Sequence, residues 1–198
     1  MKNLPRILTE GGLYSDKAVR ARSLGSVSIA HASIRARRAA TPVPVPPYGM
    51  VGDYVPFYFA PSSPMLYTIS QGNVEGYAEG QEPILHLEVW AEDIKDAGYP
   101  FVFTDGHAIM QYTSFYTELQ DLSNIDWPLL QAEYWNDTLA EPDRKRRRQA
   151  EFLVRDFVPW DLVRRIGTMS ESVAAIVTTI LSGTAQPPEV IVRRRWYY

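Results

Sequence analysis

The chain contains no cysteine. This absence excludes disulfide frameworks, thiol catalysis and cysteine-based zinc sites, and it is compatible with a reducing compartment. No stretch approaches the run of about 18 apolar residues that a membrane span requires, and the first residues lack the apolar core of a signal peptide. Neither Gly-x-Gly-x-x-Gly nor a Walker loop occurs, which excludes the two common nucleotide-binding loops. We therefore expect a cytoplasmic protein without a membrane segment or a metal.

The length and composition suit one globular domain. The chain has 198 residues, of which 45% are hydrophobic. A chain of this size can bury a sizeable core without disulfides or metals. We find no internal repeat and no flexible linker, so residues 1–198 are predicted to form a single domain with one long functional loop at about 115–148.

Basic residues are unevenly distributed, although the formal net charge is only −3. Three short runs hold 11 of the 20 lysines and arginines, namely Arg35, Arg37 and Arg38; Arg144, Lys145, Arg146, Arg147 and Arg148; and Arg193, Arg194 and Arg195. Fields act locally over a Debye length of about 10 Å, so such runs can bind a phosphate backbone on a mildly acidic protein. The alternative is that each run is a solvated face.

Short apolar patterns predict short helices and strands in mixed order. Helices are expected at about 3–10, 33–39, 64–69, 91–97 and 170–181, and strands at 55–59, 84–90, 99–103, 151–154 and 189–192. The proline-rich stretch at 41–47 predicts an extended surface connector. Without a regular alternation of strands and longer helices, this pattern favours an α+β fold over a doubly wound one.

Six motifs stand in order along the chain, from residue 3 to the C-terminus. They are Asn-Leu-Pro-Arg-Ile-Leu at 3–8, His-Ala-Ser-Ile-Arg-Ala-Arg-Arg at 31–38, Val-Gly-Asp-Tyr-Val-Pro-Phe-Tyr-Phe-Ala-Pro at 51–61, Phe-Thr-Asp-Gly-His at 103–107, Gln-Ala-Glu-Phe-Leu-Val at 149–154 and a terminal Val-x-Val-x-x-x-Trp-Tyr at 190–197. Together they resemble one known family, the DarT toxins. The resemblance implies an ADP-ribosyltransferase fold in which two small, mainly antiparallel sheets form a cleft for NAD⁺. The implied reaction transfers ADP-ribose from NAD⁺ to a base in single-stranded DNA, either thymidine or guanosine, and releases nicotinamide.

The same resemblance implies roles for individual residues. Glu151 and Arg38 match the catalytic pair, Arg38 also matches a clamp for the NAD⁺ diphosphate, and Tyr58 and Met65 match the nicotinamide side of the pocket. A carboxylate in a dry cleft suits this chemistry, because positive charge develops on the ribose as its bond to nicotinamide breaks. Arg35 and Arg37 are alternatives to Arg38. His107 lies in a matching motif and receives no catalytic role.

Residues 115–148 correspond to the substrate-recognition loop of the family. Aromatic residues (Trp127, Tyr134, Trp135) precede the basic cluster Arg144, Lys145, Arg146, Arg147 and Arg148. Stacking aromatics together with phosphate-neutralising charge are what a single-strand binder needs, so we predict that the cluster binds DNA. Core packing is the alternative for the two tryptophans.

One departure from the family concerns the histidine-bearing strand that usually precedes the Asn-Leu-Pro helix and holds the NAD⁺ ribose. The sequence starts two residues before Asn3, and His31 lies beyond the first helix. We therefore expect weaker NAD⁺ binding by this form. The resemblance also implies a macrodomain antitoxin as partner, and we expect a monomer. The alternatives are a transferase of the same fold that acts on RNA or protein, including the tRNA 2′-phosphotransferase type, and a non-catalytic NAD- or nucleic-acid-binding module.

Overall fold

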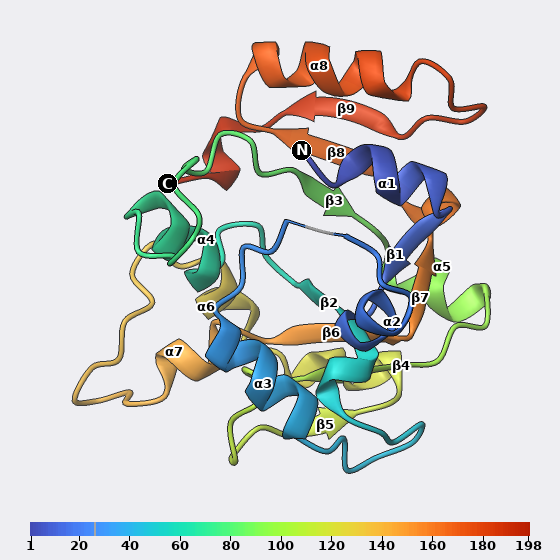
Figure 1. Cartoon of the computed structure of the whole chain (residues 1–198). Coiled ribbons are helices and arrows are strands. Elements are labelled where there is room, and N and C mark those ends of the chain that lie inside the picture. The colour runs from blue at the N-terminus through green and yellow to red at the C-terminus, as the bar shows by residue number, and fades with distance from the viewer. Residues whose placement is uncertain (26) are drawn as a thin grey trace.

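The largest sheet has four antiparallel strands in a computed structural model that describes residues 1–25 and 27–198 (Figure 1). Its strands, in spatial order, are β2 (Tyr54–Tyr58), β6 (Glu151–Arg155), β4 (Phe101–Thr104) and β5 (Phe115–Tyr116). Neighbouring strands in this sheet come from distant parts of the chain. The sheet therefore brings the motifs at 51–61, 103–107 and 149–154 side by side.

A second sheet contains three strands, β3 (His86–Glu88), β8 (Arg165–Thr168) and β9 (Glu189–Val192). β3 and β8 are antiparallel, whereas β8 and β9 are parallel. A further antiparallel pair, β1 (Gly12–Tyr14) and β7 (Phe157–Pro159), was not predicted. The mixed α+β architecture with two small, mainly antiparallel sheets is confirmed, and this pair is an addition to it.

The helices are short, and serine side chains begin two of them where the sequence predicted. Ser63 Oγ accepts a hydrogen bond from the Leu66 amide, and Ser170 Oγ accepts one from the Val173 amide. None of the helices that the structure describes is long and apolar enough to cross a membrane. The helices are α1 (Leu4–Thr9), α2 (Asp16–Ala21), α3 (Ala32–Ala40), α4 (Pro64–Ser70), α5 (Ala91–Asp96), α6 (Trp127–Gln131), α7 (Arg144–Arg147) and α8 (Glu171–Leu181).

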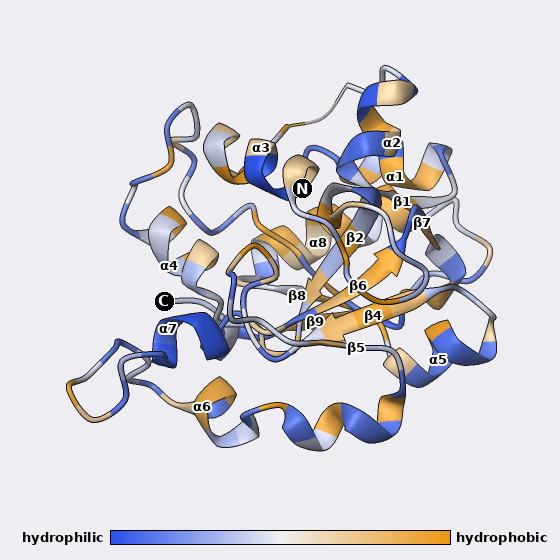
Figure 2. Cartoon of the chain, turned by 90° about the horizontal axis from the view of Figure 1, so that it is seen from below, coloured by the Kyte–Doolittle hydropathy of each residue, from blue (hydrophilic) through white to orange (hydrophobic). Residues whose placement is uncertain are grey.

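Strand β6 forms the centre of the main core. Phe152, Leu153 and Val154 are all buried, and the Phe152 ring stacks on Phe101 and Phe103 of the neighbouring strand β4. In Figure 2 the hydrophobic colour is concentrated on β4 and β6, whereas α7 is strongly hydrophilic. Because both faces of β6 are covered, any charged residue on it must find its partners inside the protein.

Further segments differ from the sequence expectations, since β8 and α2 were not predicted either. The strand expected at 84–90 is confined to β3, and residues 115–148 are more than a plain loop, since they contain β5, a 3₁₀-helix at Leu119–Asn124, α6 and α7. The proline-rich connector at 41–47 lies outside helices and strands as expected, with one isolated bridge from Pro42 to Met50.

Candidate functional site

Glu151 is the first residue of β6, and its side chain is 2% exposed. One carboxylate oxygen, Oε2, accepts a hydrogen bond from Arg38 Nη1 at 2.7 Å. The other, Oε1, lies 3.0 Å from His107 Nδ1 and accepts the Ala108 amide at 3.1 Å. The backbone is fixed as well, because the Glu151 amide donates to Thr104 Oγ1 at 3.1 Å. The carboxylate therefore has one orientation, set by Arg38 on one oxygen and by residues 107–108 on the other.

Arg38 reaches Glu151 from α3, and its side chain is 15% exposed. The other two arginines of this run are engaged elsewhere. Arg35 pairs with Asp16 at 2.5 Å, and Arg37 Nη2 donates to the Ile109 carbonyl at 3.3 Å. Arg38 Nη2 is buried and has no hydrogen-bond partner within the described chain. It is therefore a donor that an anionic group could satisfy.

Opposing influences act on the ionisation of Glu151. Burial alone would raise the pKa of this carboxyl group, but the Arg38 charge and the contact with His107 outweigh burial and hold its pKa below the usual range. Glu151 is therefore a fixed negative charge at neutral pH and a poor proton acceptor. A buried carboxylate requires both a partner of opposite charge and hydrogen-bond donors, and Glu151 has both.

Tyr58 lies directly opposite Glu151 in the pairing of β2 with β6. Directly opposed residues share one face of a sheet, so the phenol and the carboxylate are neighbours. Burial raises the pKa of the Tyr58 hydroxyl, and the nearby Glu151 charge raises it further, so the phenol stays neutral. Phe57 and Phe59, by contrast, pack against the main core.

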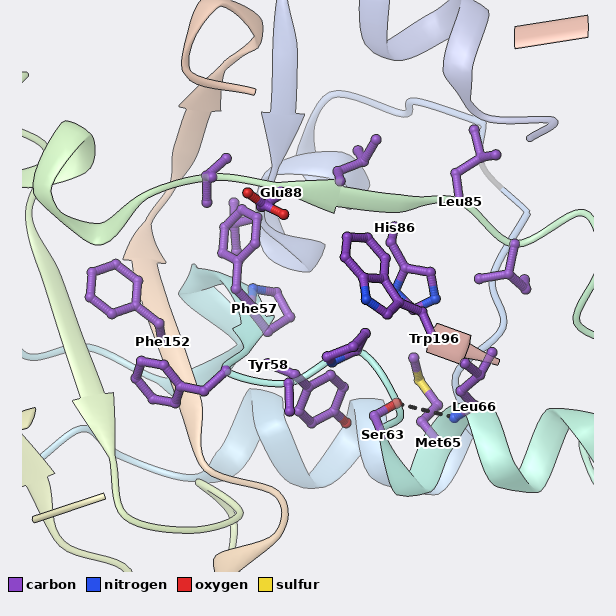
Figure 3. Close-up of a pocket in the computed structure, with 18 of the residues that line it drawn as sticks. Phe57, Tyr58, Ser63, Met65, Leu66, Leu85, His86, Glu88, Phe152 and Trp196 are labelled. Carbon is purple, nitrogen blue, oxygen red and sulfur yellow. Dashed lines mark hydrogen bonds between the residues drawn. The ribbon is translucent and has the colours of Figure 1, made fainter. Parts of the chain in front are cut away.

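Two pockets meet at β2. The first has a volume of about 460 Å³, and Arg38, Tyr58, Met65, His107 and Glu151 all line it. The second, of about 530 Å³, lies between β2 and β3 (Figure 3). Tyr58 and Met65 line both pockets. Volumes of this size suit small-molecule ligands, and the structure thus brings together all four residues expected at the NAD⁺ site.

His86 of β3 lines the second pocket and was not singled out from the sequence. Its ring makes edge contacts with Trp196 and Tyr197, with ring centres 5.5 and 4.8 Å apart. Figure 3 shows His86 and Trp196 on the β3 side of the pocket and Met65 opposite them. Burial lowers the pKa of His86 to about 4, so the ring is neutral at physiological pH. The sequence feature that could have identified His86 is its position on the polar face of the strand expected at 84–90.

The basic cluster at 144–148 is largely engaged within the protein. Its arginine contacts are Arg144 with Glu141 at 2.5 Å, Arg146 with Asp105 at 2.7 Å and Asp143 at 2.8 Å, and Arg147 with Asp126 and with Glu141 at 2.8 Å. Arg148 is buried and donates to the carbonyls of Leu130 and Ser62. Lys145 alone in this cluster is exposed and has no acidic partner among the residues described. DNA binding by the cluster stays a prediction, and four of its five members already have partners inside the protein.

The tryptophans of residues 115–148 take part in packing. Trp127 makes an edge contact with Phe59 at 5.5 Å and donates Nε1 to the Leu122 carbonyl at 3.0 Å. Trp135 makes an edge contact with Tyr67 at 5.8 Å. Tyr134, by contrast, is 79% exposed. No group of three or more acidic or histidine side chains is placed to hold a metal within the described ranges.

The chain matches a known protein family over its whole length. The family model described as "ssDNA thymidine ADP-ribosyltransferase, DarT" matches residues 1–198. The chain belongs to the DarT family. A DNA ADP-ribosyl transferase of Thermus aquaticus is 44% identical over 202 residues, which cover 100% of this chain and 86% of the relative.

Solved structures of another DarT confirm the fold. Thermus sp. 2.9 DarT in complex with ADP-ribosylated ssDNA superposes with a TM-score of 0.93 and 43% identity, covering 99% of this chain and 91% of that one. The same protein in complex with NAD⁺ superposes with a TM-score of 0.89 and 41% identity, covering 99% and 92%. The ADP-ribosyltransferase fold expected from the sequence motifs is therefore confirmed.

Proposed function

We propose that this DarT protein transfers ADP-ribose from NAD⁺ to thymidine in single-stranded DNA and releases nicotinamide. The observation that carries the proposal is the buried ion pair between Glu151 and Arg38 at the wall of a 460 Å³ pocket. The thymidine in the family description favours that base over guanosine. NAD⁺ and modified single-stranded DNA each occupy a related DarT in solved complexes.

Glu151 acts as the electrostatic catalyst in this proposal. The bond between nicotinamide and the ribose breaks, its electron pair leaves with nicotinamide, and positive charge develops on the ribose. A fixed carboxylate stabilises that charge more strongly in a buried site than in water. Its contacts with Arg38, His107 and the Ala108 amide hold the carboxylate in place before the reaction, so little reorganisation is needed.

Arg38 has two functions in the proposed site. It keeps Glu151 ionised, and its unpartnered Nη2 is suited to an oxygen of the NAD⁺ diphosphate. Because a guanidinium group is a permanent cation in proteins, Arg38 holds its charge rather than exchanging a proton. A part for Arg38 in removing the proton from the target base is a further hypothesis from the family. Tyr58 and Met65 line the region where the two pockets meet, and we assign the nicotinamide ring to it.

The biological setting follows from the substrates. NAD⁺ and transient single-stranded DNA occur together in the cytoplasm, where we propose that the protein acts as a monomeric toxin. A macrodomain antitoxin of the DarG type that removes the modification is the partner we expect. The relevant neighbour, Thermosipho africanus DarTG in complex with ADP-ribose, is 22% identical and supports the fold alone.

The decisive experiment incubates the protein with labelled NAD⁺ and, separately, thymidine-containing single-stranded DNA, RNA and protein. We expect label on the DNA only, together with release of nicotinamide. Label on RNA or protein would identify a transferase of the same fold with another acceptor. Binding of NAD⁺ without transfer to any acceptor would identify a non-catalytic module.

A further inference from the structure

The loop between β4 and β5, residues 105–114, presents an exposed aromatic side chain and also contributes His107 to the catalytic pocket. Tyr112 is 84% exposed, whereas the base of the loop is fixed. The Ser114 amide donates to Asp105 Oδ1 at 2.9 Å, and Arg146 Nη1 donates to the same oxygen at 2.7 Å. A large ring is thus displayed to solvent on an ordered support.

The loop folds back over His107. The His107 carbonyl accepts hydrogen bonds from the Met110 amide at 3.0 Å and from Thr113 Oγ1 at 2.8 Å. Tyr112 precedes Thr113, and His107 itself contacts Glu151 at 3.0 Å. Tyr112 therefore belongs to a loop that is anchored on His107, the residue that touches the proposed catalytic carboxylate.

A positive charge lies beside the same loop. Arg37 of α3 adjoins Arg38, and its Nη2 donates to the Ile109 carbonyl at 3.3 Å (α3 is labelled in Figure 1). Arg37 is exposed and forms no ion pair with any acidic side chain described. Its charge is thus available to an outside anion, in contrast to Arg144, Arg146 and Arg147, which acidic side chains already neutralise.

We propose that Tyr112 and Arg37 form a rim that holds the DNA strand beside the target base. Tyr112 stacks on a neighbouring base, and Arg37 neutralises a backbone phosphate. Aromatic stacking and phosphate neutralisation are the two contacts that single-strand binders combine. The rim rests on the proposed function, and it moves the DNA path from the basic cluster to Arg37 and the loop 105–114.

The experiment measures the affinity of a thymidine-containing single-stranded oligonucleotide across a range of salt concentrations. Tyr112→Ala should weaken binding by about 5- to 100-fold, while Tyr112→Phe, which keeps the ring, should bind like the wild type. Arg37→Gln should reduce the slope of log affinity against log salt by about 0.7. The matched controls are Tyr134→Ala, an exposed aromatic in the segment 115–148, and Lys145→Gln, the free charge of the basic cluster, and neither should change binding. NAD⁺ affinity, measured on the same samples, should be unchanged in every variant.

Four results would overturn the rim. If Tyr134→Ala and Lys145→Gln weaken DNA binding and Tyr112→Ala does not, the DNA strand passes over the basic cluster. If none of the four substitutions at Tyr112, Arg37, Tyr134 and Lys145 alters DNA binding, the strand binds elsewhere, for example at Arg193, Arg194 and Arg195. A parallel loss of NAD⁺ affinity in Tyr112→Ala would show a general distortion rather than a DNA contact. A wild-type protein that neither binds nor modifies the oligonucleotide would contradict the proposed function itself, and the rim with it.

Discussion

Gly52→Ala should slow the reaction through a contact that lies behind Arg38. Gly52 packs against the backbone of α3, and a Cβ atom on it would lie 3.1 Å from Ala39 Cα and 3.3 Å from the Ala39 nitrogen. Both atoms belong to the backbone, so a side-chain rotation cannot relieve the contact. Helix α3 must then move by a few tenths of an ångström, and Arg38 moves with it.

The size of the effect follows from the geometry. A displacement of about 1 Å in an active site can cost about 100-fold in rate, so a shift of about 0.3 to 0.5 Å predicts a loss of about 4- to 10-fold in kcat. Insertion of a methyl group into a packed contact costs about 1–3 kcal/mol, which lowers the melting temperature by about 2–12 °C in a protein of this size.

The assay compares kcat for DNA modification and melting temperature in Gly52→Ala and in a control, Gly183→Ala. A Cβ at Gly183 would meet no atom within 4 Å, so this variant should match the wild type or melt slightly higher, because alanine restricts the unfolded chain. Full activity and full stability of Gly52→Ala would refute the argument that this close approach sets the position of Arg38.

Three further predictions concern ionisation and packing. Arg38→Gln removes the largest influence that opposes the burial of Glu151, which raises the pKa of this carboxyl group; kcat should fall about 100-fold, and the residual rate should begin to decline at a higher pH than the wild-type rate as the pH is lowered. Burial lowers the pKa of His86 to about 4 in the folded protein. Below a pH of about 6.5, His86 therefore binds a proton in the unfolded state but not yet in the folded state. Stability should therefore fall by about 2 kcal/mol from pH 7 to pH 5, and urea titrations of His86→Leu should lack this loss. Arg148→Met removes two buried hydrogen bonds to carbonyls and should destabilise by about 1–3 kcal/mol in urea, without changing the salt dependence of DNA binding.

Local patterns predicted those elements that carry their own start and stop signals. The helices expected at 170–181 and 64–69 correspond to α8 and α4, and each begins after a serine that caps it, Ser170 and Ser63 respectively. The strands β1 and β7 were missed because each has only three residues and is stabilised by its partner across the chain. Such pairings depend on long-range contacts that a local window does not contain.

The family motifs selected residues that lie together in one pocket, whereas the run of basic residues at 144–148 did not indicate how those residues are paired. Glu151, Arg38, Tyr58 and Met65 line one pocket, as the motif order implied. A run of basic residues, however, does not reveal its ion-pair partners, and Arg146 is neutralised by Asp105, 41 residues away. His107 was left without a role because its contact with Glu151 arises from strand pairing between β4 and β6.

The most direct test of the account is the mass of a thymidine-containing single-stranded oligonucleotide after incubation with NAD⁺ and either wild-type protein or Glu151→Gln. Glutamine keeps the shape of the side chain and removes its charge. The wild type should add one ADP-ribose unit to the oligonucleotide, whereas Glu151→Gln should still bind NAD⁺ but add none. Wild-type turnover by Glu151→Gln would contradict the claim that the Glu151 carboxylate drives the transfer.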